Sequence, residues 1–194
     1  MLSESARIDQ LIALGKKTPP VQYETVGTSY VIRTRESIPV PGAKVWQKGP
    51  YRKIAGSSAR DTSTIITRPD GAYIYDAEKD RYIRHTKPNV PAEKTFHLLR
   101  RDKNSKLTIV GDEVIDGKEC VIVQKVAIMN GDSATSKVWV WKKNGLPVRT
   151  EATMKLGPEL VKIETDYKNF VFGDIPDSVF AVPKEKVIDA PSPN

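Results

Sequence analysis

The chain has one cysteine and two histidines among its 194 residues. A single thiol, Cys120, excludes a disulfide framework, and His85 and His97 show no Cys–His or His–His spacing typical of a metal site. The glycine-rich phosphate loop, the GxSxG elbow and the HExxH helix are all missing. We therefore predict no enzyme activity, no metal and no cofactor.

Long apolar runs are also lacking, and none approaches the about 20 residues that cross a bilayer as a helix. The first residues, MLSESARIDQLIALGKK, have no basic region followed by an apolar core, so no signal peptide is recognisable. A hydrophobic content of 39% with 28% charged residues is typical of a globular protein. The length allows one sizeable domain or two small ones.

The net charge is +7, which permits an anionic partner such as a lipid headgroup or nucleic acid. The basic residues, however, alternate with acids, as in KLGPELVKIETDYK. This pattern is more typical of a solvated surface of mixed charge.

Two segments have helical spacing of apolar residues. In Ser3–Lys17, Ile8 and Leu11 share a stripe, a serine can cap the start, and Pro19 follows the end. In Asn89–Lys103, Pro91 suits the first turn. Ala92, Phe96 and Leu99 form the stripe of this second helix.

The rest of the chain predicts about eleven short strands separated by turn dipeptides such as Asp70-Gly71 and Asp116-Gly117. Such short connections favour antiparallel neighbours. The strand with the clearest alternation is Leu160–Asn169, in which Val161 and Ile163 alternate with Lys162 and Glu164. This pattern predicts one face toward water and one toward a core or cavity.

A hairpin is predicted over Lys137–Met154, with Asn144-Gly145 as a two-residue type I′ turn. Trp139 would then pair with Thr150, and Trp141 with Val148. The two tryptophans would share a face with Leu146, Val148 and Ala152, opposite Val138 and Val140. They fill either an ordinary core or a cavity for an apolar ligand.

A second hairpin, within Asp76–Lys87 and the strand before it, would pair Tyr75 with Tyr82 and Ile74 with Ile83. If the isoleucines face inward, Tyr73, Tyr75 and Tyr82 form an outward aromatic stripe. That stripe could bind single-stranded nucleic acid, but ordinary cross-strand pairing explains it better, so we expect no nucleic-acid partner.

Four segments resemble motifs of the bacterial lipoprotein-sorting carriers, the LolA/LolB-like superfamily. These are KVWQKGPYR, the hairpin TRPDGAYIYDAEKDRYIR, the tryptophan strand with its GLP-R turn, and the closing NFVFGDIPDSVFAVP. The resemblance implies an unclosed antiparallel half-barrel whose concave side is covered by helices and holds acyl chains. It also implies an extracytoplasmic location, in the periplasm or cell envelope.

We therefore predict one α+β domain over residues 1–188, a strongly curved sheet with covering helices, and a flexible tail over residues 189–194. The predicted function is non-catalytic binding of an acyl lipid or lipoprotein, as carrier or receptor, by a monomer that contacts membrane surfaces. The predicted lining residues are Trp46, Trp139, Trp141, Val148, Ile163, Tyr167, Ile8, Leu11, Phe96 and Leu99. The alternative is a protein-interaction or stress-sensor module with no lipid, whose partner docks at an open sheet edge.

Overall fold

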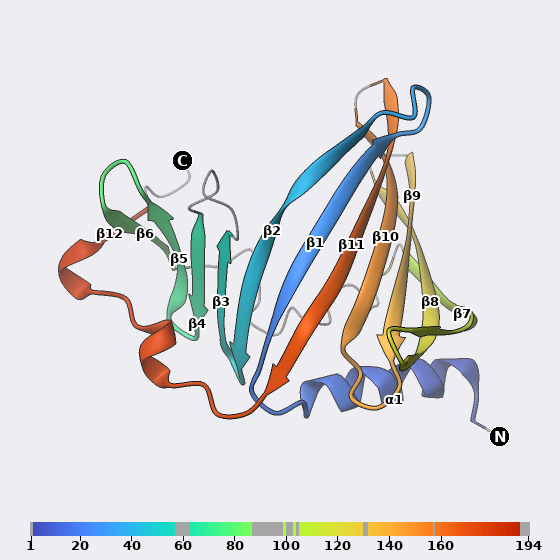
Figure 1. Ribbon diagram of the computed structural model, residues 1–194, viewed down its shortest axis with the longest axis horizontal. Helices are drawn as coiled ribbons and strands as arrows, with labels where there is room; N and C mark the ends of the chain where they lie inside the picture. The colour runs from blue at the N-terminus through green and yellow to red at the C-terminus, as the bar shows by residue number, and fades with distance from the viewer. Residues whose placement is uncertain are drawn as a thin grey trace. The chain divides into compact units, whose positions relative to one another are not determined.

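The computed structural model describes residues 2–56, 63–86, 99, 103, 105–129, 132–156 and 158–190, and they are mainly β-structure (Figure 1). The elements in chain order are α1 (Glu4–Lys16), β1 (Val21–Val31), β2 (Ser37–Lys48), β3 (Tyr51–Gly56), β4 (Thr64–Arg68), β5 (Gly71–Asp76), β6 (Arg81–His85), β7 (Ser105–Ile115), β8 (Lys118–Met129), β9 (Asp132–Trp141), β10 (Pro147–Leu156), β11 (Glu159–Phe172), η2 (Asp177–Phe180), η3 (Lys184–Lys186) and β12 (Val187–Asp189).

The described strands form one sheet in the order β12-β6-β5-β4-β3-β2-β1-β11-β10-β9-β8-β7. Eleven of them match the strands predicted from sequence, but the sheet has twelve. The extra strand, β12, runs parallel to β6, with Val187 opposite Tyr82, so the sheet is mixed and the prediction of a wholly antiparallel sheet is wrong. A strand of three residues is too short to show an alternating pattern.

The first predicted helix is confirmed as α1. The Ser3 hydroxyl caps it by accepting a hydrogen bond from the Ala6 N–H at 3.2 Å, and Lys16 lies in its last turn. The second predicted helix, Asn89–Lys103, lies almost wholly outside the described residues, so its covering of the sheet stays a prediction. No helix in the described part of the chain is long and apolar enough to cross a membrane.

The chain divides into two compact units, and β1, β2 and β11 contribute residues to both. Unit 1 comprises Met1–Thr18, Val26–Val40 and Thr95–Lys168; unit 2 comprises Pro19–Thr25, Pro41–Lys94 and Asn169–Asn194. Asp189, where the tail is predicted to begin, is the last residue of β12, and residues 191–194 lie outside the description. The single domain over residues 1–188 stays a prediction.

Each unit has its own apolar core. In unit 1 one cluster joins α1 to β8 and β9, and a second lies around Cys120 and Trp139. In unit 2 the cluster consists of Ile66, Tyr73, Ile175 and Phe180, which bring η2 and the segment before it onto β4 and β5.

The predicted register of the tryptophan hairpin is wrong by one residue. The connection is four residues long, because the Trp141 N–H donates to the Leu146 carbonyl at 2.8 Å. Only Gly145 in it has a positive φ, +74°, so the turn is not type I′. A register shift between Pro147 and Arg149 then places Arg149, not Thr150, opposite Trp139.

The pairing of Tyr75 with Tyr82 is confirmed, with ring centroids 5.0 Å apart. The predicted faces are wrong, however, because Tyr73 is buried in the core of unit 2 while Ile74 is 39% exposed. The side of β5 that carries Tyr73 is packed against Phe180 and Ile175. The outward aromatic stripe that would have favoured nucleic acid therefore does not exist.

Candidate functional site

One apolar face of unit 1 carries α1, and we call it the α1-side face. Ile8 and Leu11 of α1 are buried against β8 and β9, in a cluster completed by Leu99, Val121, Val123, Val138 and Val140. Figure 1 shows α1 running beside the ends of these strands. The helix can approach closely because valines, not larger side chains, lie beneath it.

The α1-side face continues across β10 and β11. Val138 pairs with Thr150 and Thr150 with Thr165, so these side chains lie on the same side of the sheet as the valines. On the same face, two positions further along the strands, Ser136 pairs with Lys125 and Ala152, and Ala152 with Ile163. Two positions further again, Met154 pairs with Val161. Ala152, Met154 and Ile163 are half-buried. Apolar surface therefore extends past the strands that α1 covers.

The opposite face of β10 and β11 is charged. Arg149 donates to Asp166 at 2.7 Å, and Lys162 lies 2.9 Å from Glu151 and 2.7 Å from Glu164. Partly exposed pairs of this kind contribute little to stability, but they mark the polar face of the two strands. Charged and apolar side chains therefore alternate in β11 as predicted for Leu160–Asn169, although residues on both faces are partly buried.

The structure divides the predicted lining residues into groups. Ile8, Leu11 and Leu99 lie in the α1 cluster, and Ile163 and Tyr167 lie on the same face of β11. Trp139, Trp141 and Val148 lie in the other cluster of unit 1, with Ile115 and Cys120. Trp46 packs in unit 2, and Phe96 lies outside the described residues.

Trp139 follows Val138 in β9, so it faces away from α1. Its indole N–H donates to the Glu113 carboxylate at 2.6 Å, and the Arg149 guanidinium lies 6.0 Å from its ring centroid. Beside it, burial raises the pKa of the Cys120 thiol to about 11, which keeps that thiol protonated and unreactive. Through these contacts Trp139 packs as part of the core of unit 1.

The valines that pack against α1 were not identified from the sequence. In the segment VWVW the tryptophans were favoured because they are larger. The pattern shows that valines and tryptophans lie on opposite faces, but it does not show on which face a helix distant in sequence packs.

A small pocket of about 260 Å³ lies beside α1. Its lining residues are Arg7, Gln10, Leu11, Leu14, Val121 and Lys142. Its volume is below that of ordinary ligand cavities.

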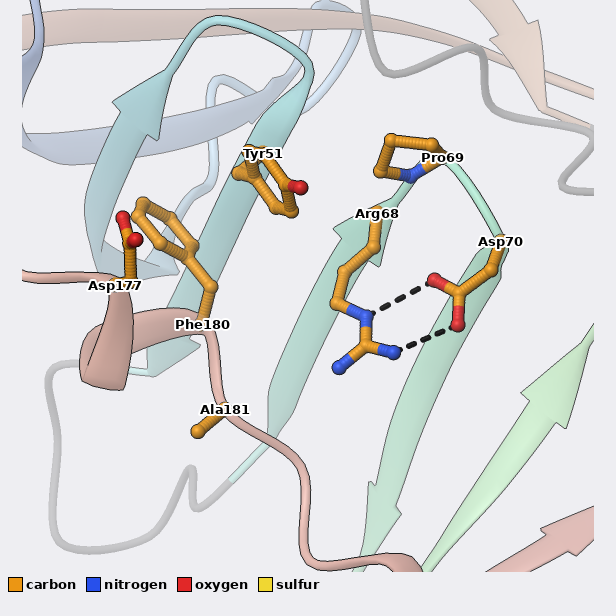
Figure 2. A pocket seen from close by; sticks show the side chains of 7 residues that line it. All are labelled: Tyr51, Arg68, Pro69, Asp70, Asp177, Phe180 and Ala181. Carbon is orange, nitrogen blue, oxygen red and sulfur yellow. Dashed lines mark hydrogen bonds and ion pairs between the residues drawn. The ribbon is translucent and has the colours of Figure 1, made fainter.

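A larger pocket, of about 420 Å³, lies within unit 2 and is shown in Figure 2. Its lining residues are Tyr51, Arg68, Pro69, Asp70, Asp177, Phe180 and Ala181. Its residues all lie in three of the segments that resemble lipoprotein-sorting carriers, but the sequence did not indicate that these segments meet, because the β4–β5 turn and the closing segment are more than a hundred residues apart.

Three side chains at this pocket form a fixed polar network. Arg68 donates from Nε and Nη2 to the two Asp70 oxygens at 2.9 and 2.6 Å, and the Tyr73 hydroxyl donates to Asp70 at 2.6 Å. The Arg68 guanidinium also stacks 4.8 Å from the Tyr73 ring centroid. These bonds, from Arg68 above all, hold the pKa of Asp70 well below its usual range.

The network predicts a pH-dependent stability. A carboxyl whose pKa is lowered by folding stabilises the native state above its unfolded pKa of about 3.9, and this contribution is lost as the pH falls below that value. Asp70→Asn should therefore lower the urea midpoint clearly at pH 7 and less at pH 3. If the urea midpoints of the variant and the wild type differed by the same amount at pH 7 and pH 3, the ionised Asp70 carboxylate would not be what stabilises the fold.

Among the described residues, no group of three or more His, Cys, Asp or Glu side chains could hold a metal ion. No protein-family model matches the chain, and no curated protein matches it.

Solved structures share the fold. An uncharacterized conserved protein from Thermus thermophilus superposes with a TM-score of 0.64 at 11% identity, over 97% of this chain and 100% of that chain. MucB of Pseudomonas aeruginosa, in its complex with MucA, gives 0.60 at 12% identity, over 94% of this chain and 62% of that chain. The Mycobacterium tuberculosis lipoprotein LppX gives 0.50 at 13% identity, over 85% and 93%.

A LolA superfamily protein from Nitrosomonas europaea also matches, at a TM-score of 0.47 and 12% identity, over 93% of this chain and 98% of that chain. The superposition on the lipoprotein LppX confirms the resemblance to lipoprotein-sorting carriers as a likeness of fold, and a shared fold leaves the activity open.

Proposed function

We propose that the protein binds an acyl chain of a lipid or lipoprotein, without catalysis, on the α1-side face of unit 1. We place this activity in the cell envelope and assign it to a monomer. The observation that carries the proposal is the division of β10 and β11 into a charged face and an apolar face that extends beyond α1.

Of the predicted set, Ile163 and Tyr167 are half-buried on this face and are proposed to contact the chain. Ile8, Leu11 and Leu99, which are buried in the α1 cluster, are proposed to form the packed end of the site. Each buried methylene contributes about 0.8 kcal/mol, so a sixteen-carbon chain gains on the order of 10 kcal/mol before the cost of ordering it. This gain is sufficient for tight binding with no specific polar contact. The fold of the lipoprotein LppX is consistent with the proposal.

The experiment is titration with a fluorescent fatty acid. Ile163→Glu places a carboxylate on the α1-side face, and we expect it to weaken binding at least about ten-fold, because burying an unpaired charge costs several kcal/mol. Lys168→Glu is the matched control, since it introduces the same side chain on the opposite face of β11 and should bind like wild type.

Trp139→Phe separates this assignment from the one predicted by sequence. Binding that falls with Trp139→Phe and not with Ile163→Glu would place the ligand on the tryptophan face and refute the proposal.

A second candidate is a protein-binding module. MucB, which has this fold, was solved with MucA. Among the described strands β7 ends the order, is 11 residues long, and leaves Val110 and Val114 48% and 63% exposed. A partner strand could pair with such an edge. Failure to take up any fatty acid would favour this candidate.

A further inference from the structure

The pocket in unit 2 is built from residues that the proposed acyl site does not use. Its apolar wall consists of the Tyr51 and Phe180 rings, whose centroids lie 5.8 Å apart at 41°, and of the Pro69 ring. Phe180 is fixed by burial, whereas Tyr51 is 38% exposed. Such a wall fits a flat apolar group.

On the polar side of the pocket each carboxylate is already paired with a cation, and the Arg68 guanidinium has one nitrogen without a partner among the described residues. Asp70 already accepts from Arg68 and Tyr73, and Asp177 accepts from Lys48 at 2.8 Å. Arg68 uses Nε and Nη2 for Asp70, while its Nη1 has no partner among the described residues. In Figure 2 this nitrogen points away from Asp70, toward the side of the pocket where Ala181 lies.

We infer that this pocket binds an aromatic carboxylate, with its ring against the wall formed by Tyr51, Phe180 and Pro69 and its carboxylate on Nη1 of Arg68. The two hydrogen bonds to Asp70 and the contact with the Tyr73 ring hold the guanidinium in one orientation before the ligand binds. Binding therefore costs little side-chain entropy, and the hydrogen bond to the carboxylate is charge-assisted.

The test uses 3-phenylpropionate and its neutral amide, 3-phenylpropionamide, followed by calorimetry and by NMR shifts of the labelled protein. The acid should bind roughly ten-fold or more tightly than the amide. Shifts should centre on Tyr51, Arg68 and Ala181. Equal affinity of acid and amide, or shifts elsewhere, would overturn the inference.

Arg68→Lys tests the role of Nη1 without removing the charge. The single lysine nitrogen is taken by Asp70, so the preference for the acid should vanish while the affinity for the amide stays near that of wild type. Loss of the second hydrogen bond to Asp70 and of the stacking on Tyr73 should lower the urea midpoint. A preference for the acid that survives in Arg68→Lys would refute the assignment.

Tyr51→Ala tests the apolar wall and should weaken acid and amide by the same factor. Tyr75→Ala, in the same unit and outside the pocket, is the control and should change neither. If Tyr51→Ala leaves both affinities unchanged, the ring does not bind where we place it.

A free acid and the C-terminus of a peptide ending in phenylalanine share this chemistry. Tighter binding of N-acetyl-Ala-Ala-Phe than of 3-phenylpropionate would identify a peptide terminus as the source, and weaker binding would identify a free acid. Binding of the C-terminally amidated peptide as tightly as the free one would count against the inference.

Discussion

Gly145→Ala should lower the free energy of unfolding by roughly 2–4 kcal/mol, as measured by urea denaturation. A Cβ atom at this position would lie 2.3 Å from the Leu11 carbonyl oxygen and 2.5 Å from the Gly15 nitrogen. Both are backbone atoms of α1, so neither can rotate away. The turn between β9 and β10 can approach α1 this closely only because Gly145 has no side chain.

Gly117→Ala is the matched control, because Gly117 has nearly the same φ, +71°, and nothing within 4 Å of the added Cβ. It should cost only about 1 kcal/mol, the strain of a left-handed alanine. The difference between the two variants therefore isolates the contact with α1. Equal losses would show that α1 does not pack against this turn.

Ile8→Ala should cost about 3 kcal/mol, which is typical of truncating a fully buried isoleucine. Ile8 is 1% exposed and contacts the valine cluster of β8 and β9. Gln10→Ala, on the exposed side of the same helix, should change stability by less than about 0.5 kcal/mol. A loss of similar size in both variants would mean that α1 is not docked through its predicted stripe.

The elements of this fold could be predicted because their signals are local. The Ser3 cap, the spacing of Ile8 and Leu11, and turn pairs such as Asp116-Gly117 each lie within a few neighbouring residues. The same holds for the alternation in β11, where one residue in two forms ion pairs. Short connections then led to the antiparallel order of β2–β6 and β7–β11.

What could not be predicted depends on residues distant in sequence. β12 exists because three residues meet the free edge of β6, about a hundred positions earlier. The hairpin register depends on Asn144, whose side-chain oxygen accepts from the Leu146 N–H at 3.0 Å, and on α1 pressing against Gly145. A two-residue turn was the simplest reading of Asn144-Gly145 alone.

The same limit applies to the candidate site. Alternation shows that Trp139 and Val138 face opposite sides, yet only the packed position of α1 shows which side is apolar and covered. The pocket of unit 2 joins Arg68 to Phe180, which stand in two motifs far apart in the chain, so neither motif alone could have indicated the pocket.

The most direct test of the central claim is native mass spectrometry of the purified protein after incubation with palmitate. We predict an adduct of one acyl chain per protein molecule, strongly reduced in Ile163→Glu and retained in Lys168→Glu. A spectrum that shows only the unmodified mass at saturating palmitate would contradict acyl-chain binding on the α1-side face.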